Sequence, residues 1–290
     1  MNINFTFVRH GLSCINAKRT LSYTTKLDKR ILRNVLDLDD PHLSQMGVET
    51  SVNNGKVIEN IMFNIHKFSN IKIDTVDLVG CSPLIRSMET AYYMTRNWKT
   101  PPKKIVIFPL LRELDESAVD PYSKYSKNIL QSVPGYSMKE IREQKEYLKS
   151  IGILDFFDFS IIEMESELRT EPGNIQKFIE WFDESIDISS DYEHKFNVFI
   201  VTHAGVLHQF AHEGYVNNSG FILNTTLKDS TIEYNEFISM NNYLPIYFFK
   251  DYNNAKYNLD YYCPSNRCGK LCTLSDNKSL KKIEFNKNNF

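Results

Sequence analysis

The hydrophobic positions of this chain follow two periods, one typical of strands and one typical of helices. Residues 3–8 alternate between inward and outward positions and are rich in aromatic and β-branched side chains, which predicts a strand. Short apolar runs at 76–80, 104–108 and 197–202 predict three more strands. Segments of helical or turn character follow these runs. We therefore expect a mostly parallel sheet that is covered by helices on both faces.

Helical patterns lie between these strands. Ser44 can cap a helix that continues to about Ile65, because apolar residues recur at helical spacing between Val48 and Ile61. The other predicted elements are helices over 85–96, 138–150 and 204–212, and additional strands or a hairpin near an edge within 219–238 and 245–249.

One long stretch interrupts the alternation of strands and helices. It covers about residues 114–173 and contains Pro121 and Pro134-Gly135, so we interpret it as an insertion that covers the site. The sequence thus predicts a catalytic domain over 1–250 that includes this cap, followed by a polar tail over 251–290. The predicted fold class is a three-layer α/β/α sandwich with a mostly parallel sheet and an inserted cap.

Composition and charge narrow the classes of partner. The 290 residues include 34 Lys and Arg against 36 Asp and Glu, a net charge of -2. This balance gives no broad basic field, so we expect no nucleic-acid partner, and an anionic substrate would need a local cluster of cations. No apolar run approaches the ~18 residues of a membrane helix. Without a signal-peptide pattern or a disulfide framework, the predicted location is cytoplasmic, with no membrane partner.

Side chains suited to phosphate chemistry follow all four predicted strands. Arg9 and His10 come directly after the first strand, and Arg86 stands in the first turn of the helix after the second. Glu113 follows the third strand, and His203 ends the fourth. Because ligands gather at the carboxyl ends of parallel strands, we expect these side chains to converge. Guanidinium groups match phosphate oxygens, and helix N-termini favour anions.

Together these motifs resemble the histidine phosphatase superfamily, also called the phosphoglycerate mutase-like family. The resemblance spans about residues 3 to 213, with the motifs in family order. The family pattern is an Arg-His-Gly-x-Ser-x-x-Asn opening, an Asp-x-x-Leu-[Ser/Thr]-x-x-Gly segment, a Ser-Pro-Leu-x-Arg-x-x-x-Thr-Ala segment, a Leu-x-Glu and a His-Ala-Gly. In this chain the matching residues are Arg9 to Asn16, Asp40 to Gly47, Ser82 to Ala91, Leu111 to Glu113, and His203 to Gly205.

The resemblance implies a phosphoglycerate mutase-like fold and a role for each matching side chain. His10 would be the nucleophile that becomes a phosphohistidine, and Glu113 would give a proton to the leaving oxygen. The phosphoryl group would be bound by Arg9, Asn16, Arg86 and His203. The implied enzyme is a metal-independent phosphomonoesterase without a cofactor, acting on a small phosphomonoester or a phosphoprotein.

Departures from the mutase pattern favour hydrolysis. Position 12 is Leu and position 15 is Ile, where the mutase-type opening commonly carries Glu and Trp, and the sequence after Glu113 does not resemble the mutase's Arg-His-Tyr-Gly. Glu116, one helical turn further on, competes with Glu113 as proton donor. A mutase that uses the same phosphohistidine and a catalytically silent relative that binds phosphorylated ligands are the alternative functions.

A group of cysteines near the end of the chain allows two interpretations. Cys263, Cys268 and Cys272 could bind zinc together with His208 or His212. Their spacing is irregular and contains no Cys-x-x-Cys pair, so reduced, solvent-facing thiols are the alternative.

Two cysteines and a basic run lie near the motifs. Cys14 and Cys81 have no clear histidine base, so we expect buried small side chains rather than a cysteine nucleophile. The basic run from Lys18 to Arg33 is either a subsite for a second anionic group or a solvated face. The sequence determines neither the identity of the substrate nor the oligomeric state.

Overall fold

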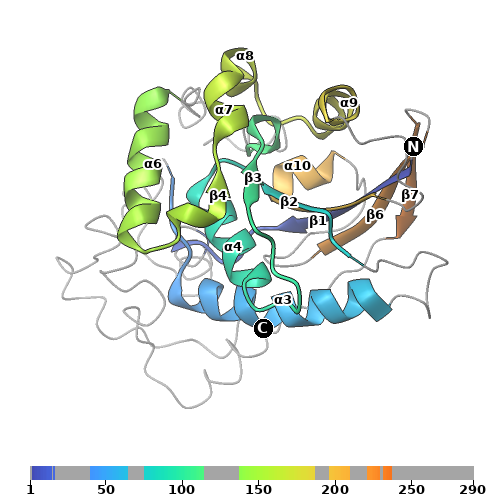
Figure 1. Cartoon of the computed structure of the whole chain (residues 1–290), viewed down its shortest axis with the longest axis horizontal. Coiled ribbons are helices and arrows are strands. Elements are labelled where there is room, and N and C mark those ends of the chain that lie inside the picture. Colours follow the sequence, from blue (N-terminus) through green and yellow to red (C-terminus); the bar gives the residue numbers. More distant parts are fainter. Residues whose placement is uncertain are drawn as a thin grey trace, which may run out of the picture.

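A single seven-stranded sheet organises the described part of the chain. The computed structural model describes residues 2–14, 16, 40–64, 75–113, 137–186, 196–209, 221–228 and 231–236. The strand order is β4-β3-β2-β5-β1-β6-β7 (Figure 1). In spatial order the strands are β4 (Phe157–Asp158), β3 (Ile105–Ile107), β2 (Leu78–Cys81), β5 (Phe196–Thr202), β1 (Asn2–Arg9), β6 (Phe221–Lys228) and β7 (Thr231–Glu236).

The pairing of the strands confirms the prediction of a mostly parallel sheet. The five strands from β4 to β1 pair in parallel, whereas β6 and β7 form an antiparallel hairpin at one edge. The hairpin lies within the predicted range 219–238. Residues 245–249, also predicted as a strand, lie outside the described residues.

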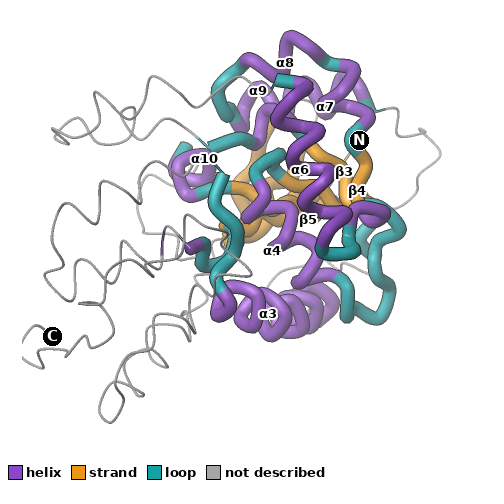
Figure 2. The backbone as a smooth tube through the Cα atoms, turned by 90° about the vertical axis from the view of Figure 1, so that its left-hand side faces the viewer, coloured by secondary structure: helices purple, strands orange, loops and turns teal. Residues whose placement is uncertain are grey.

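Helices cover both faces of the sheet, as the sandwich prediction requires (Figures 1 and 2). One face packs against α3, α4 and α6, and the other against α9 and α10. The helices are α3 (Gln45–Asn64), α4 (Ile85–Thr95), η2 (Pro109–Leu111), α6 (Met138–Ser150), η5 (Leu154–Phe156), α7 (Ser160–Met164), α8 (Ser166–Thr170), α9 (Ile175–Ser185) and α10 (Ala204–His208).

Polar side chains set where several helices begin. The hydroxyl of Ser44 accepts a hydrogen bond of 3.0 Å from the backbone N–H of Gly47, which confirms the predicted start of α3. Ser137 begins α6 with a capping box, in which Ser137 and Glu140 each accept a hydrogen bond from the other's backbone N–H. The side chain of Asn174 caps α9 by accepting a hydrogen bond from the backbone N–H of Lys177, and the sequence pattern did not predict this helix.

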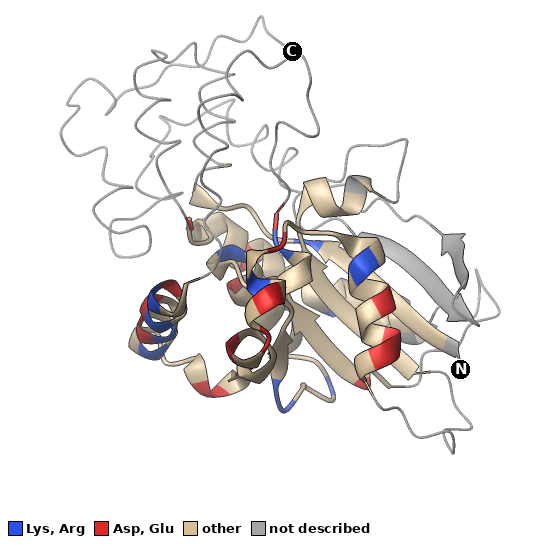
Figure 3. Cartoon of the chain, turned by 90° about the horizontal axis from the view of Figure 1, so that it is seen from above, with Lys and Arg blue, Asp and Glu red and all other residues tan. Residues whose placement is uncertain are grey.

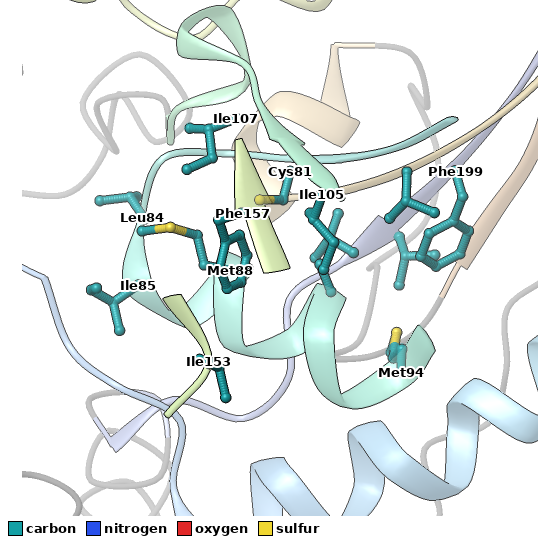
Figure 4. Packing of buried hydrophobic residues seen from close by; sticks show 14 of the residues in the cluster. Cys81, Leu84, Ile85, Met88, Met94, Ile105, Ile107, Ile153, Phe157 and Phe199 are labelled. Carbon is teal, nitrogen blue, oxygen red and sulfur yellow. The ribbon is translucent and has the colours of Figure 1, made fainter. Parts of the chain in front are cut away.

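Alternate residues of the central strand β5 face two separate cores. Phe199 and Val201 belong to the core beneath α4, and Val198 and Ile200 belong to the core beneath α9. Figure 4 shows side chains of α4, such as Met88, directed toward the strands in the first of these cores. A strand that is apolar on both faces is typical of a covered parallel sheet.

A buried pair of amides joins the two central strands. Asn4 of β1 and Asn197 of β5 are partners in the parallel register. The side-chain N–H of Asn4 donates a hydrogen bond of 3.0 Å to the side-chain oxygen of Asn197. This bond satisfies polar atoms that would otherwise be costly to bury.

Part of the segment predicted as a cap insertion continues the sheet. Strand β4 pairs in parallel with β3, with Ile105 opposite Phe157 and Val106 opposite Asp158. Phe157 is buried in the same core as Ile105. Residues 114–136 and 237–290 lie outside the described residues. The limits of the cap and of the tail therefore stay predictions.

Charged side chains of both signs are interleaved on the surface. Helix α6 carries alternating basic and acidic residues along its length (Figure 3). In the described ranges, no helix combines the length and the apolar character that a bilayer crossing requires.

The aromatic core beneath α9 predicts a large stability effect at Phe178. Its ring packs at centroid distances of 6.0, 5.1 and 5.6 Å from Phe5, Phe108 and Phe182. Phe178→Ala should lower the free energy of unfolding by about 3–5 kcal/mol, because it leaves a cavity among these rings. The control is Phe156→Ala, at a side chain that is 41% exposed, which should cost about 1 kcal/mol or less. Urea unfolding measures both, and equal losses would contradict the packing.

Candidate active site

The imidazole of His10 lies buried at the carboxyl end of β1. Its backbone N–H donates a hydrogen bond of 2.8 Å to the carbonyl of Thr202, which joins the ends of β1 and β5. Its Nδ1 lies 2.7 Å from the carbonyl oxygen of Gly11. A carbonyl can only accept, so Nδ1 carries the hydrogen and the lone pair is on Nε2. This is the ring state that a nucleophile at Nε2 requires.

Glycine is needed directly after this histidine. A Cβ atom on Gly11 would lie 2.7 Å from the hydroxyl oxygen of Ser51, which is too close for a real side chain. The backbone N–H of Gly11 donates a hydrogen bond of 2.8 Å to the hydroxyl of Thr90. The loop after β1 is thereby held against α4.

Arg86 directs its guanidinium at His10 from the first turn of α4. Its Nε donates a hydrogen bond of 3.3 Å to Nε2 of His10. Its two terminal nitrogens lie 3.9 Å from a carboxylate oxygen of Asp40 and 3.8 Å from one of Glu113. All three guanidinium nitrogens thus face a side chain of the site.

The second histidine lies at the carboxyl end of β5. The rings of His203 and His10 have centroids 5.1 Å apart. Nε2 of His203 lies 2.7 Å from the hydroxyl of Ser82 and 3.3 Å from that of Ser87. Its Nδ1 lies 3.5 Å from the carboxylate of Glu113.

Two hydrogen bonds position Glu113, one to its side chain and one to the segment that precedes it. One carboxylate oxygen accepts a hydrogen bond of 3.1 Å from the backbone N–H of Gly205, at the start of α10. The hydroxyl of Thr202 donates to the carbonyl of Leu111 at 2.8 Å, which joins the segment before Glu113 to β5. The side chain of Glu113 is 23% exposed, so solvent reaches this side of the site.

The two other predicted phosphate ligands are placed in different ways. Arg9 is buried and lies close enough to lower the pKa of both His10 and His203 by its charge. The side-chain oxygen of Asn16 accepts a hydrogen bond of 2.8 Å from the hydroxyl of Ser13. That Asn16 binds the phosphate stays a prediction. Glu116 lies outside the described residues.

Burial and neighbouring cations keep both histidines neutral. Burial is the largest cause that lowers the pKa of His10 well below its usual value, and Arg86 and Arg9 lower that pKa further. The pKa of His203 is lowered in the same way by burial, by Arg86 and by His10. At neutral pH both rings are therefore uncharged, and the guanidiniums supply the positive charge.

Three side chains of the site also have the spacing of metal ligands. His10, Glu113 and His203 offer ligand atoms within 4.8 Å of one another, a spacing that could hold a cation. The positive charges of Arg86 and Arg9 oppose a cation at this position and favour an anion. The predicted absence of a metal stays a prediction.

The cysteines and the remaining histidines that the sequence singled out fall into two groups. Cys14 and Cys81 have buried side chains, and burial raises the pKa of the Cys81 thiol, so Cys81 is not a thiolate nucleophile. The candidate zinc ligands lie outside the described residues or have side chains outside them. These candidate ligands are Cys263, Cys268, Cys272, His208 and His212. The basic run from Lys18 to Arg33 also lies outside the described residues.

Several side chains around the site had no predicted role. Ser82 and Thr90 lie within the matching segment, and only the structure shows their bonds to His203 and Gly11. Asp40 opens another motif, but its contact with Arg86 joins residues 46 positions apart. A side-chain contact over such a separation leaves no periodic signal in one sequence.

Known proteins resemble this chain in structure at low sequence identity. No protein-family model matches the sequence, and no curated protein matches it. Solved structures of phosphatases and of a phosphoglycerate mutase match over most of the chain. A phosphoserine phosphatase from Entamoeba histolytica, in complex with 3-phosphoglyceric acid, is 13% identical, covers 83% of this chain and 99% of its own, and has a TM-score of 0.39.

Two other solved structures show a similar level of likeness. A phosphoglycerate mutase from Bacillus anthracis is 15% identical, covers 81% of this chain and 92% of its own, and has a TM-score of 0.42. A mycobacterial glucosyl-3-phosphoglycerate phosphatase is 12% identical, covers 82% of this chain and 98% of its own, and has a TM-score of 0.41. Identities this low do not transfer a substrate from one protein to another.

The buried neutral histidines predict a loss of stability in acid. A group whose pKa is lower in the folded state takes up protons on unfolding, so stability falls as pH drops below about 6.5. We expect the free energy of unfolding to fall less between about pH 7 and about pH 5 in His203→Asn than in the unchanged protein. The raised pKa of Asp40 acts in the opposite direction, but it is common to both proteins. Urea unfolding at the two pH values measures the difference, and identical pH dependence would contradict a neutral His203.

Proposed function

We propose that this chain is a metal-independent phosphomonoesterase of the histidine phosphatase type, with His10 as nucleophile. One observation carries the proposal: Nε2 of His10 has its lone pair exposed to the guanidinium of Arg86, with Nδ1 bonded to Gly11. His203 and Glu113 place further polar atoms close to this nitrogen, with all three side chains offering atoms within 4.8 Å of one another. The expected substrate class is a small phosphomonoester or a phosphorylated side chain of a protein.

The first chemical step transfers the phosphoryl group to the histidine. Nε2 of His10 forms a bond to phosphorus while the bond between phosphorus and the substrate's ester oxygen breaks. The leaving oxygen takes the proton of the Glu113 carboxyl group and departs as an alcohol. Beyond this, the protein positions these groups and stabilises the charge on the three other phosphoryl oxygens.

The second step returns the enzyme to its starting state. The carboxylate of Glu113 removes a proton from water, and the oxygen of that water bonds to phosphorus while the phosphorus–nitrogen bond breaks. Inorganic phosphate leaves, His10 regains its lone pair, and Glu113 is protonated again. Division of the reaction into two displacements lowers each barrier.

Positive charge at fixed positions would stabilise both transition states. Arg86 and Arg9 carry that charge inside a buried site, where electrostatic interactions are stronger than in water. The neutral ring of His203 is available as a hydrogen-bond donor or acceptor next to Glu113. These groups are sufficient for phosphoryl transfer without a metal ion.

Removal of the nucleophile tests the proposal directly. His10→Ala should lower kcat for p-nitrophenyl phosphate by at least about a thousandfold, because it removes the nitrogen that is proposed to form the phosphoenzyme. The unchanged protein should keep its turnover in EDTA. Thermal unfolding checks that the variant is folded. Turnover by neither protein would favour a binding role, and phosphoryl exchange much faster than hydrolysis would favour a mutase.

The role of Glu113 depends on the leaving group. Glu113→Gln should lower kcat for an alkyl phosphate by about a hundredfold or more, because an alkoxide must be protonated as it leaves. With p-nitrophenyl phosphate the first step should be much less affected, since p-nitrophenolate departs without a proton. Burst kinetics separate this step from hydrolysis of the phosphoenzyme. Equal losses of the first step for both leaving groups would exclude Glu113 as the acid.

A further inference from the structure

Asp40 supplies a carboxylate to the start of α4 from a distant part of the chain. Its two oxygens accept hydrogen bonds of 2.9 and 3.0 Å from the backbone N–H of Ile85, the first residue of the helix. One of these oxygens lies 3.9 Å from the guanidinium of Arg86. The carboxylate therefore satisfies an N–H that the helix leaves unpaired and also faces the cation of the site.

Gln144 of α6 fixes the other side of this carboxylate. Its side-chain nitrogen donates hydrogen bonds of 2.8 Å to Asp40 and 2.8 Å to the carbonyl of Pro83. Turning the amide over would place its oxygen against two other acceptors, so only this orientation is favourable. The amide of Gln144 is thereby fixed by Asp40 and Pro83 together.

The amide of Gln144 is retained at a cost. The side chain is 6% exposed, and its oxygen has no hydrogen-bond partner among the described residues. A buried acceptor without a partner is unfavourable, and an apolar side chain would avoid that cost. The presence of an amide here is explained by the two groups that its nitrogen binds.

A second set of contacts holds the same segment between α4 and α6. Tyr147, one turn after Gln144, donates a hydrogen bond of 2.7 Å to the buried carboxylate of Glu89 in α4. The other oxygen of Glu89 accepts one of 2.6 Å from the backbone N–H of Leu43. Residues 40–43 are therefore fixed at both ends by side chains of the two helices.

A carboxylate next to a phosphate site needs an explanation, because its charge repels the substrate. Burial raises the pKa of Asp40 to about 6, while Arg86, Gln144 and the N–H of Ile85 oppose this rise and Glu89 adds to it. At neutral pH Asp40 is therefore still mainly ionised. Selection for phosphate affinity alone would not place an anion here, whereas a need to orient Arg86 would.

We propose that Asp40 and Gln144 are positioning residues, with Gln144 fixing the carboxylate of Asp40 and Asp40 holding the guanidinium of Arg86 in line with Nε2 of His10. This inference rests on the proposed phosphatase function. An arginine side chain has many rotamers, and contacts at all three nitrogens restrict it to one. Gln144 of α6 thus acts on Asp40, and Asp40 acts on Arg86, which would bind the phosphate.

Two substitutions test the proposal without touching Arg86. Gln144→Met keeps the volume and changes no charge, and it removes the hydrogen bonds of the amide to Asp40 and to the carbonyl of Pro83. Asp40→Asn keeps an acceptor for the N–H of Ile85 but removes the charge that orients Arg86. We expect each to lower kcat for p-nitrophenyl phosphate by about tenfold or more, in the range seen for groups that orient catalytic ligands. Gln144→Met should also weaken binding of inorganic phosphate several-fold, measured by calorimetry.

Asp77→Asn is the matched control. Asp77 also accepts a backbone hydrogen bond, of 2.8 Å from Asn197, but it precedes β2 at the opposite end of the sheet. This variant should keep both kcat and phosphate affinity, and thermal unfolding shows that all three variants are folded during the assays.

Other results would overturn the inference. If Gln144→Met keeps the kcat and the phosphate affinity of the unchanged protein, the contact between Gln144 and Asp40 has only a structural role. Tighter phosphate binding with unchanged kcat in Asp40→Asn would show that Asp40 acts as a repelling charge alone. If the unchanged protein binds phosphate without turnover, the hydrolase assignment fails, and the phosphate affinity of Gln144→Met still decides the positioning role. If it binds no phosphate, both proposals fall.

Discussion

A guanidinium and an uncharged imidazole face each other across 3.3 Å, and the rest of the site is arranged around this contact. A protonated ring at His10 would repel Arg86 and would have no lone pair. Burial in an environment that already contains positive charge keeps the ring neutral. The carbonyl of Gly11 then determines which of the two nitrogens is available. Burial, charge and backbone geometry thus together keep Nε2 of His10 unprotonated.

The topology of the sheet brings the members of the site together. Strands β2, β5 and β1 are adjacent and parallel, so the residues that follow their carboxyl ends meet at one edge. Cys81 pairs with Val201, and Arg9 pairs with Thr202, which aligns the ends of the three strands to within a residue. The short helix α10 adds the N–H that binds Glu113. Rigid strands therefore hold groups that lie far apart along the chain at fixed distances, as phosphoryl transfer requires.

Sequence patterns predicted the parts of this arrangement that depend on local order. The strands with strong apolar runs, the cap at Ser44 and the convergence of His10, Arg86, Glu113 and His203 all follow from local patterns and the rule for parallel strand ends. The two-residue strand β4 is too short to show a period, and it was assigned to an insertion. The bond between Asp40 and Gln144 joins residues 104 positions apart, and such a contact depends on how α6 packs. Side chains that are proposed to bind the substrate lie in motifs, whereas the contacts that hold them in place depend on tertiary packing.

The buried bond between Asn4 and Asn197 has a consequence for how the chain finds its register. Apolar side chains alternate with polar ones along β1, and the bond between the two amides adds a polar contact that forms in this register. A shift by one residue would break this side-chain bond and would turn every side chain of β1 to the other face of the sheet. A pair of uncharged side chains near the start of β1 thus favours one register of the strand, and the register determines where His10 lies at its other end.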